Sequence, residues 1–183
     1  MKKKVLVFIS LLCGYLSPTH AQDISIRTNL VGLSTLNLNV EPSISIGNKK
    51  RWSLHLPIQY NPFVLDGNKK MQNLTVMPGV RYWFLESYVK NYVGAYLVAT
   101  NYHGGNIFGD KYRYYGDAYG LGISYGFAKP IAKRWNIELE GGIGAIWADY
   151  EKYTCKKCGK KVGDYNGWYI LPTKLSASVV YLF

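Results

Sequence analysis

The sequence is poor in cysteine, in acidic residues and in long apolar runs. It has 3 cysteines among 183 residues, and 22 lysines and arginines against 11 aspartates and glutamates. Beyond the N-terminal leader no segment approaches about 18 consecutive apolar residues, which argues against a helical membrane anchor. Aromatic residues are abundant at 15% and charged residues modest at 18%, so the chain is not of the disordered kind. A single folded domain is the simplest expectation.

The N-terminus has the features of an export signal. A start with three lysines is followed by an apolar run over 5–12 and by a small-residue cleavage pattern over 19–21. We therefore expect a cleaved signal peptide over 1–21 and one domain over 22–183. Cys13 raises the alternative of a lipoprotein signal, but a leucine precedes it where a small residue is expected.

Loss of the leader would remove three lysines and lower the net charge from +11 to +8. A basic exported protein can meet nucleic acid, anionic lipid or polysaccharide. Most lysines lie in turn-like segments and no nucleic-acid motif is present, so lipopolysaccharide or surface glycans are the expected partners. Solvated loops without a specific partner are an equally simple interpretation.

Short stretches of alternating apolar and polar residues run along the whole chain. In the last of them one face carries Leu175, Ala177, Val179, Tyr181 and Phe183. Alternation with a period of two is the pattern of a β-strand. The pattern predicts strands over 24–31, 36–46, 52–60, 74–84, 92–102, 119–127, 135–147 and 174–183.

The connections between these strands alternate in length. Short turns are expected near residues 48, 87 and 131, and long loops over 61–71, 103–115 and 150–168. This alternation, an even strand count from eight, and Trp and Tyr near strand ends are typical of outer-membrane barrels. We predict an all-β fold: an eight-stranded antiparallel up-and-down transmembrane β-barrel in the outer membrane of a Gram-negative bacterium. Its terminal Val179, Tyr181 and Phe183 would be the signal read by the barrel-insertion machinery.

The face opposite the apolar one carries charged residues, and its direction decides between two kinds of barrel. In a lipocalin the apolar face points inward, whereas in a membrane barrel it points to lipid. We favour lipid outside, with an interior charge network that plugs the barrel. That network comprises Arg27, Glu41, His55, Arg81, Glu138, Glu140 and Lys174.

The only compact motif is Cys155-Lys156-Lys157-Cys158. A CxxC pair is half of a zinc site, so zinc is the one conceivable cofactor, but four ligands are normally needed. In an exported chain the two cysteines can instead close a disulfide or remain reduced. Thiol–disulfide catalysis is the least expected, because the motif lies in a loop. We interpret the pair as a loop staple.

Enzymatic activity is not expected. A catalytic histidine needs a nucleophile and an orienting acid nearby, and no such spacing is recognisable around His55 or His103. The glycines at 141, 142 and 144 lie within a predicted strand and do not precede a helix, so they are not a phosphate-binding loop.

Several short motifs in a fixed order resemble one known family. They are Arg27-Thr28-Asn29-Leu30, Lys50-Arg51-Trp52-Ser53-Leu54, Val80-Arg81-Tyr82-Trp83-Phe84, the stretch 120–126, Lys133-Arg134-Trp135-Asn136, the stretch 153–159 and Pro172-Thr173-Lys174. With them the chain resembles a Bacteroidetes outer-membrane family known only as domain of unknown function 3575, a small OmpA/OmpW-like barrel. The resemblance implies a small barrel sometimes considered alongside fimbrial genes, and it implies no reaction and no catalytic residues.

These observations predict a non-enzymatic outer-membrane protein with Tyr- and Lys-rich surface loops. Its role would be structural, or an interaction with lipopolysaccharide, glycans or fimbrial subunits. The alternatives are a lipocalin-like ligand-binding barrel and, less expected, a lipid-modifying barrel enzyme.

Overall fold

The computed structural model describes residues 23–65, 69–105, 112–154 and 160–183. The predicted signal peptide over 1–21 lies outside these residues. Nearly all of the described chain is antiparallel β-sheet. The elements are β1 (Ile24–Asn29), α2 (Leu30–Ser34), β2 (Leu38–Ile46), β3 (Trp52–His55), β4 (Ile58–Asn61), β5 (Val64–Leu65), β6 (Lys69–Val76), β7 (Gly79–Trp83), β8 (Lys90–Gly105), β9 (Arg113–Ala132), β10 (Trp135–Tyr153) and β11 (Lys161–Leu182). In this part of the chain no helix is long and apolar enough to cross a membrane.

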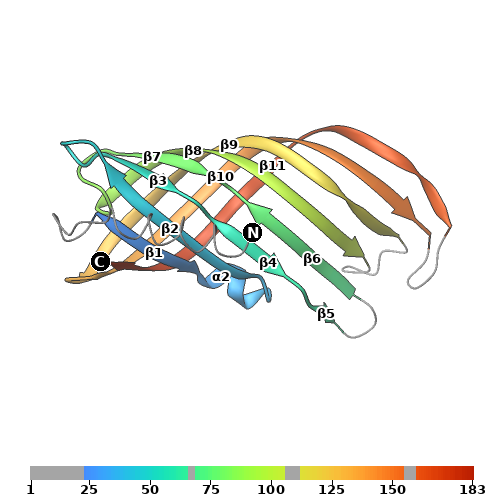
Figure 1. Ribbon diagram of the computed structural model, residues 1–183, viewed down its shortest axis with the longest axis horizontal. Coiled ribbons are helices and arrows are strands. Elements are labelled where there is room, and N and C mark those ends of the chain that lie inside the picture. The colour runs from blue at the N-terminus through green and yellow to red at the C-terminus, as the bar shows by residue number, and fades with distance from the viewer. Residues whose placement is uncertain (1–22, 66–68, 106–111, 155–159) are drawn as a thin grey trace, which may run out of the picture.

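The strands form a ring of eight, because β1 pairs with both β11 and β2 (Figure 1). Two of the eight are interrupted. β3 and β4 are separated at Pro57, and β6 and β7 at Pro78, yet each pair continues along the same neighbours. A proline, which has no N–H for the ladder, lies at each of these two breaks. The predicted eight antiparallel strands are therefore present.

The strands of the second half are longer than predicted. Residues 103–105 belong to β8, 113–115 to β9, and 150–153 and 161–168 to β10 and β11, so the loops expected over 103–115 and 150–168 were largely wrong. Tyr150 pairs with Tyr165, and the rings stack with centroids 5.8 Å apart. Turn-forming residue types suggested loops here, but cross-strand aromatic pairs extend the ladder.

Two further boundaries differ from the prediction. The first strand ends at Asn29, whose side-chain oxygen accepts a hydrogen bond from the Val31 N–H and so caps α2. The expected loop over 61–71 contains β5, which pairs Val64 with Lys70 of β6.

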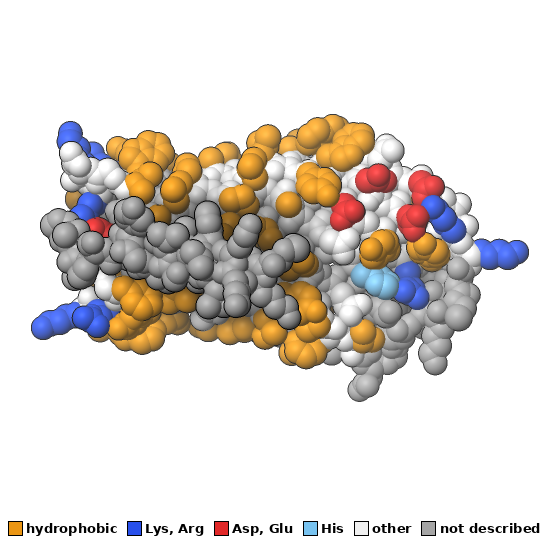
Figure 2. Space-filling model, viewed as in Figure 1, with side chains coloured by type: hydrophobic (Ala, Val, Ile, Leu, Met, Phe, Trp, Pro, Cys, Tyr) orange, Lys and Arg blue, Asp and Glu red, His pale blue; other side chains and the backbone are white. Residues whose placement is uncertain are grey.

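Alternation separates the two faces of the ring. Outward positions hold exposed apolar side chains, among them Leu54 at 44%, Leu139 at 55% and Leu175 at 72%. Their inward neighbours, such as His55 and Glu138, are buried. Figure 2 shows hydrophobic side chains along the body of the molecule and charged ones gathered at its two ends.

The interior is not uniformly polar, which corrects the expectation of a polar plug. One apolar cluster contains Trp83, Tyr88, Tyr92, Ala128, Val180 and Leu182, and a second contains Met77, Tyr96, Val98, Ala118, Ile146 and Ala148. The small inward residues of β9 make room for these rings. A Cβ on Gly122 would lie 2.6 Å from the Tyr96 ring, and one on Gly126 would overlap Tyr92.

Candidate functional site

A cluster of charged side chains fills the ring between the two apolar clusters. Six strands contribute to it, and its charged members are Arg27 of β1, Glu41 of β2, His55 of β3, Arg81 of β7, Glu138 and Glu140 of β10, and Lys174 of β11. All seven residues proposed from the sequence therefore lie together. Their side chains are at most 8% exposed.

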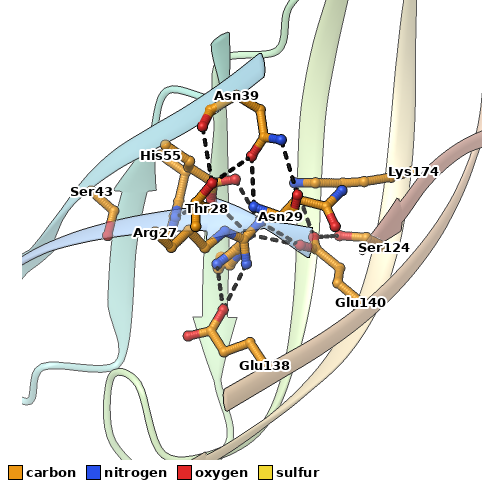
Figure 3. A network of polar contacts seen from close by, with 12 residues as sticks. Arg27, Thr28, Asn29, Asn39, Ser43, His55, Ser124, Glu138, Glu140 and Lys174 are labelled. Carbon is orange, nitrogen blue, oxygen red and sulfur yellow. Dashed lines mark hydrogen bonds and ion pairs between the residues drawn. The ribbon is translucent and has the colours of Figure 1, made fainter. Parts of the chain in front are cut away.

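Two arginines share the same three carboxylates. Arg27 donates to Glu138 at 2.6 Å, to Glu41 at 2.5 Å and to Glu140 at 2.8 Å. Arg81 donates to Glu140 at 2.7 Å, to Glu41 at 2.8 Å and to Glu138 at 3.3 Å. Planar guanidinium groups suit such multiple contacts. Figure 3 shows Asn39 and Glu138 on opposite sides of Arg27.

Lys174 completes the balance of charge. Its Nζ lies 3.1 Å from Oε1 of Glu140, which also accepts a hydrogen bond of 2.7 Å from Ser124. The guanidinium of Arg81 lies 4.6 Å from the centroid of the Tyr92 ring. With Lys174 and the two arginines, three cations face three carboxylates, so the cluster needs no counter-ion. Removing one member of such a buried set leaves an unpaired charge, which costs about 3–5 kcal/mol.

His55 links the charges to the aromatic cluster. Its Nδ1 lies 2.8 Å from Oε1 of Glu41 and its Nε2 lies 2.7 Å from Oγ of Ser53, which accepts a 2.7 Å hydrogen bond from the Trp83 indole. A hydrogen on Nδ1 satisfies every atom: Nδ1–H donates to the carboxylate, and Nε2 accepts the Ser53 hydroxyl.

Ser53, His55 and Glu41 thus have the contacts of a hydrolase triad, which the sequence spacing did not reveal. Such a triad also needs a site beside the serine for the reacting carbonyl. Ser53 is 0% exposed, and the Trp83 N–H already occupies its oxygen. The arrangement can orient His55 and satisfy buried polar atoms, but it leaves no room for a substrate.

Other residues singled out in the sequence lie elsewhere. His103 lies in β8, not at the start of a loop, and its Nε2 is 2.6 Å from Nη2 of Arg113. Cys155 and Cys158 lie outside the described residues, so neither the disulfide nor the zinc interpretation is tested. In the residues described, no group of three or more His, Cys, Asp or Glu side chains is placed so that it could hold a metal ion.

The C-terminal aromatic residues lie on the outer face. The Tyr181 ring is 5.0 Å from that of Trp135 and 5.0 Å from that of Phe183, measured between centroids. Val179 follows the same outward alternation, because Val180 beside it is fully buried.

An exposed ion-pair cluster lies where β10 and β11 are farthest from the charge cluster. Lys161 contacts Asp164 at 2.6 Å and Glu151 at 2.7 Å, and Tyr153 donates to Glu151 at 2.5 Å. Hydrogen bonds to Asp164 and Glu151 raise the pKa of Lys161. Hydrogen bonds from Lys161 and Tyr153 lower the pKa of Glu151.

Sequence reasoning missed the neutral members of the interior: Ser53, Trp83, Tyr92, Tyr96 and Ser124. Their alternation with outward apolar residues was the available signal. It was weak for Tyr92 and Tyr96, because both faces of β8 carry apolar side chains, with Tyr96 and Val98 inward and Val93 and Leu97 outward.

Comparisons with known proteins give one match. No curated protein and no solved structure is significantly similar to the chain. A family model described as "Protein of unknown function (DUF3575)" matches residues 6–183. The chain therefore belongs to this family of proteins of unknown function.

Proposed function

We propose that the protein is a non-enzymatic, eight-stranded β-barrel of the outer membrane of a Gram-negative bacterium, exported through a cleaved signal peptide. The observation that carries this proposal is the inverted distribution of polarity. Charged side chains inside the ring are at most 8% exposed, while Leu121, Ile123 and Leu175 on the outside are 59%, 62% and 72% exposed. Exposing these apolar side chains to water costs free energy, whereas in a bilayer they would contact lipid chains of the same polarity.

The aromatic residues on the outside support the same proposal. Trp135 pairs with Tyr181 near one end of the ring, and Trp147 packs against Trp168 with centroids 5.6 Å apart near the other. Along β10 the two tryptophans are separated by about 40 Å at 3.4 Å per residue. A strand tilt of about 40° reduces this to about 30 Å, the thickness of a hydrocarbon core.

The interior argues for a surface or structural role rather than transport. The charge cluster and two apolar clusters fill a ring of eight strands, a size whose interior is normally occupied by side chains. The parts offered to partners are then the outer face and the far ends of β8–β11. We expect these ends and their loops to contact lipopolysaccharide, glycans or fimbrial subunits, and Val179, Tyr181 and Phe183 to engage the insertion machinery.

The two alternatives are less well supported. A lipocalin-like carrier of an apolar ligand would need an apolar lining where Arg27, Arg81 and the glutamates lie. A lipid-modifying enzyme would need access to Ser53, which is fully buried.

Membrane fractionation and heat-modifiable migration test the proposal. The full chain should appear in the outer-membrane fraction and should migrate differently in detergent gels before and after boiling. Recovery in the periplasmic extract, with one migration position at both temperatures, would contradict it. Phe183→Ala, which we expect to slow insertion, provides a variant with impaired assembly for comparison with the wild type.

A further inference from the structure

The wall of the ring is interrupted beside β11. β11 pairs with β10 from Lys161 to Tyr181, but its pairing with β1 begins only at Ser178. Among the described residues, the stretch 161–177 has no strand on its other side. The start of α2 lies there instead: Asn29 donates to the Leu175 carbonyl at 3.1 Å and accepts from the Ala177 N–H at 3.3 Å. We call this interruption the seam.

A polar cavity of about 210 Å³ lies behind the seam. Its floor includes Arg27 and Glu41 of the charge cluster. Polar side chains line its walls, namely Asn29, Asn37, Asn39, Gln59, Thr173, Lys174 and Ser176. Apolar Val31, Val40, Ile58 and Leu175 are also part of its lining and are exposed on the outer face. The cavity therefore meets the apolar outer surface at the seam.

Two buried atoms in this lining lack a partner. The Oδ1 of Asn37 and the Oγ of Ser176 accept no hydrogen bond from any described residue, and Ser176 is only 5% exposed. The remaining contact of the Asn37 side chain is a long one, 3.5 Å from its Nδ2 to Gln59. Buried polar atoms without partners are uncommon in folded proteins and call for an explanation.

The charges of the lining are already balanced. Arg27 binds three carboxylates and Lys174 binds Glu140. The buried groups of the lining that remain free are the amide oxygen of Asn37 and the hydroxyl of Ser176. Together they offer acceptors and one donor, which suits a neutral, hydroxyl-rich group. The volume is below the range of about 300–1,000 Å³ typical of drug-sized ligands, so a single sugar ring is the right scale.

The depth of the seam indicates where the ligand comes from. Leu175 pairs with Gly141, which lies between Trp135 and Trp147 of β10, the two outward tryptophans near the ends of the ring. At Leu175 the seam therefore lies within the apolar part of the outer face, if the chain spans the membrane as proposed above. A molecule entering here needs a polar end for the cavity and an apolar chain for the outer face.

We propose that the cavity binds the neutral sugar headgroup of a membrane amphiphile, which enters through the seam with its acyl chain left along Leu175 and Ile58. This inference rests on the proposed membrane location. It assigns to the interior a binding site separate from the surface contacts of the loops.

Saturation-transfer NMR on the full protein in a sugar-free detergent, lauryldimethylamine oxide, tests the site. The probe is octyl glucoside below its micellar concentration, compared with free glucose. We expect saturation of the octyl glucoside ring protons and at least threefold weaker binding of glucose. Equal binding of both would show a free-sugar site and overturn the lipid source. Binding of neither would overturn the site itself.

Two variants and a matched control locate the binding. Ser176→Ala and Asn37→Leu each remove an atom without a protein partner, so folding should be retained while binding weakens by about three- to tenfold. Asn73→Leu removes another unpartnered oxygen, outside the cavity lining, and should bind as the wild type. Unchanged binding in both cavity variants would contradict the assignment. Heat-modifiable migration of the wild-type protein, measured in parallel, reports separately on the barrel. If the wild type migrates at the same position before and after boiling, the proposed function itself is overturned.

Discussion

Where β1 pairs with both β2 and β11, all eight strands form a ring, whereas at 113–117, 149–153 and 161–167 β9–β11 continue beyond β1 and β2 (Figure 1). We call these three stretches the extension. Inside the ring of strands, buried ion pairs and aromatic side chains packed against glycines specify one arrangement of the interior side chains. In the extension the contacts are partly exposed tyrosine pairs and ion pairs, such as Tyr150 with Tyr165. Stability should therefore depend on the ring, and the extension should tolerate change.

We expect the largest loss of stability when one cation is removed from the interior of the ring. In Arg81→Met the three glutamates would face one arginine and Lys174, leaving a buried negative charge. We expect the free energy of unfolding to fall by about 3–5 kcal/mol, measured by urea titration in detergent or liposomes. The matched control is Arg51→Met, because Arg51 is exposed at a turn. Equal stability of the two variants would show that the cluster does not hold the ring.

A smaller effect is expected from crowding the ring without changing its charge. In Gly126→Ala the new methyl group would overlap the Tyr92 ring, and we expect a loss of about 1–3 kcal/mol in the same titration. Gly141→Ala is the control, since a Cβ there meets nothing within 4 Å. If both substitutions cost the same, the difference would lie in backbone preference and not in interior packing.

The same contrast shows what the sequence could predict. Alternation over Ser53, Leu54 and His55 is a local property, so it placed each side chain inside or outside without knowledge of the partner strand. Strand length, the seam and α2 depend on which neighbour is present. Tyr150 to Tyr153 belong to a strand because 161–165 lies opposite. Their two tyrosines favour strands, but that preference alone does not set where a strand ends. The triad-like contacts of Ser53 with His55 and Glu41 likewise depend on pairing between β2 and β3.

The smallest expected effect is confined to the extension and depends on pH. Hydrogen bonds from Lys161 and Tyr153 lower the pKa of Glu151 in the folded protein. The ionised carboxylate therefore stabilises the extension fully above the ordinary glutamate pKa of about 4.3, and this stabilisation is lost as the pH falls through the lower folded-state pKa. Amide hydrogen exchange, corrected for its intrinsic pH dependence, should therefore accelerate at 149–153 and 161–164 below about pH 4. The ring should remain protected. Glu151→Gln should show the faster exchange already at pH 7, and Glu86→Gln, at an exposed turn, should not. Exchange that accelerated in the ring together with the extension would show that the two regions open as one unit.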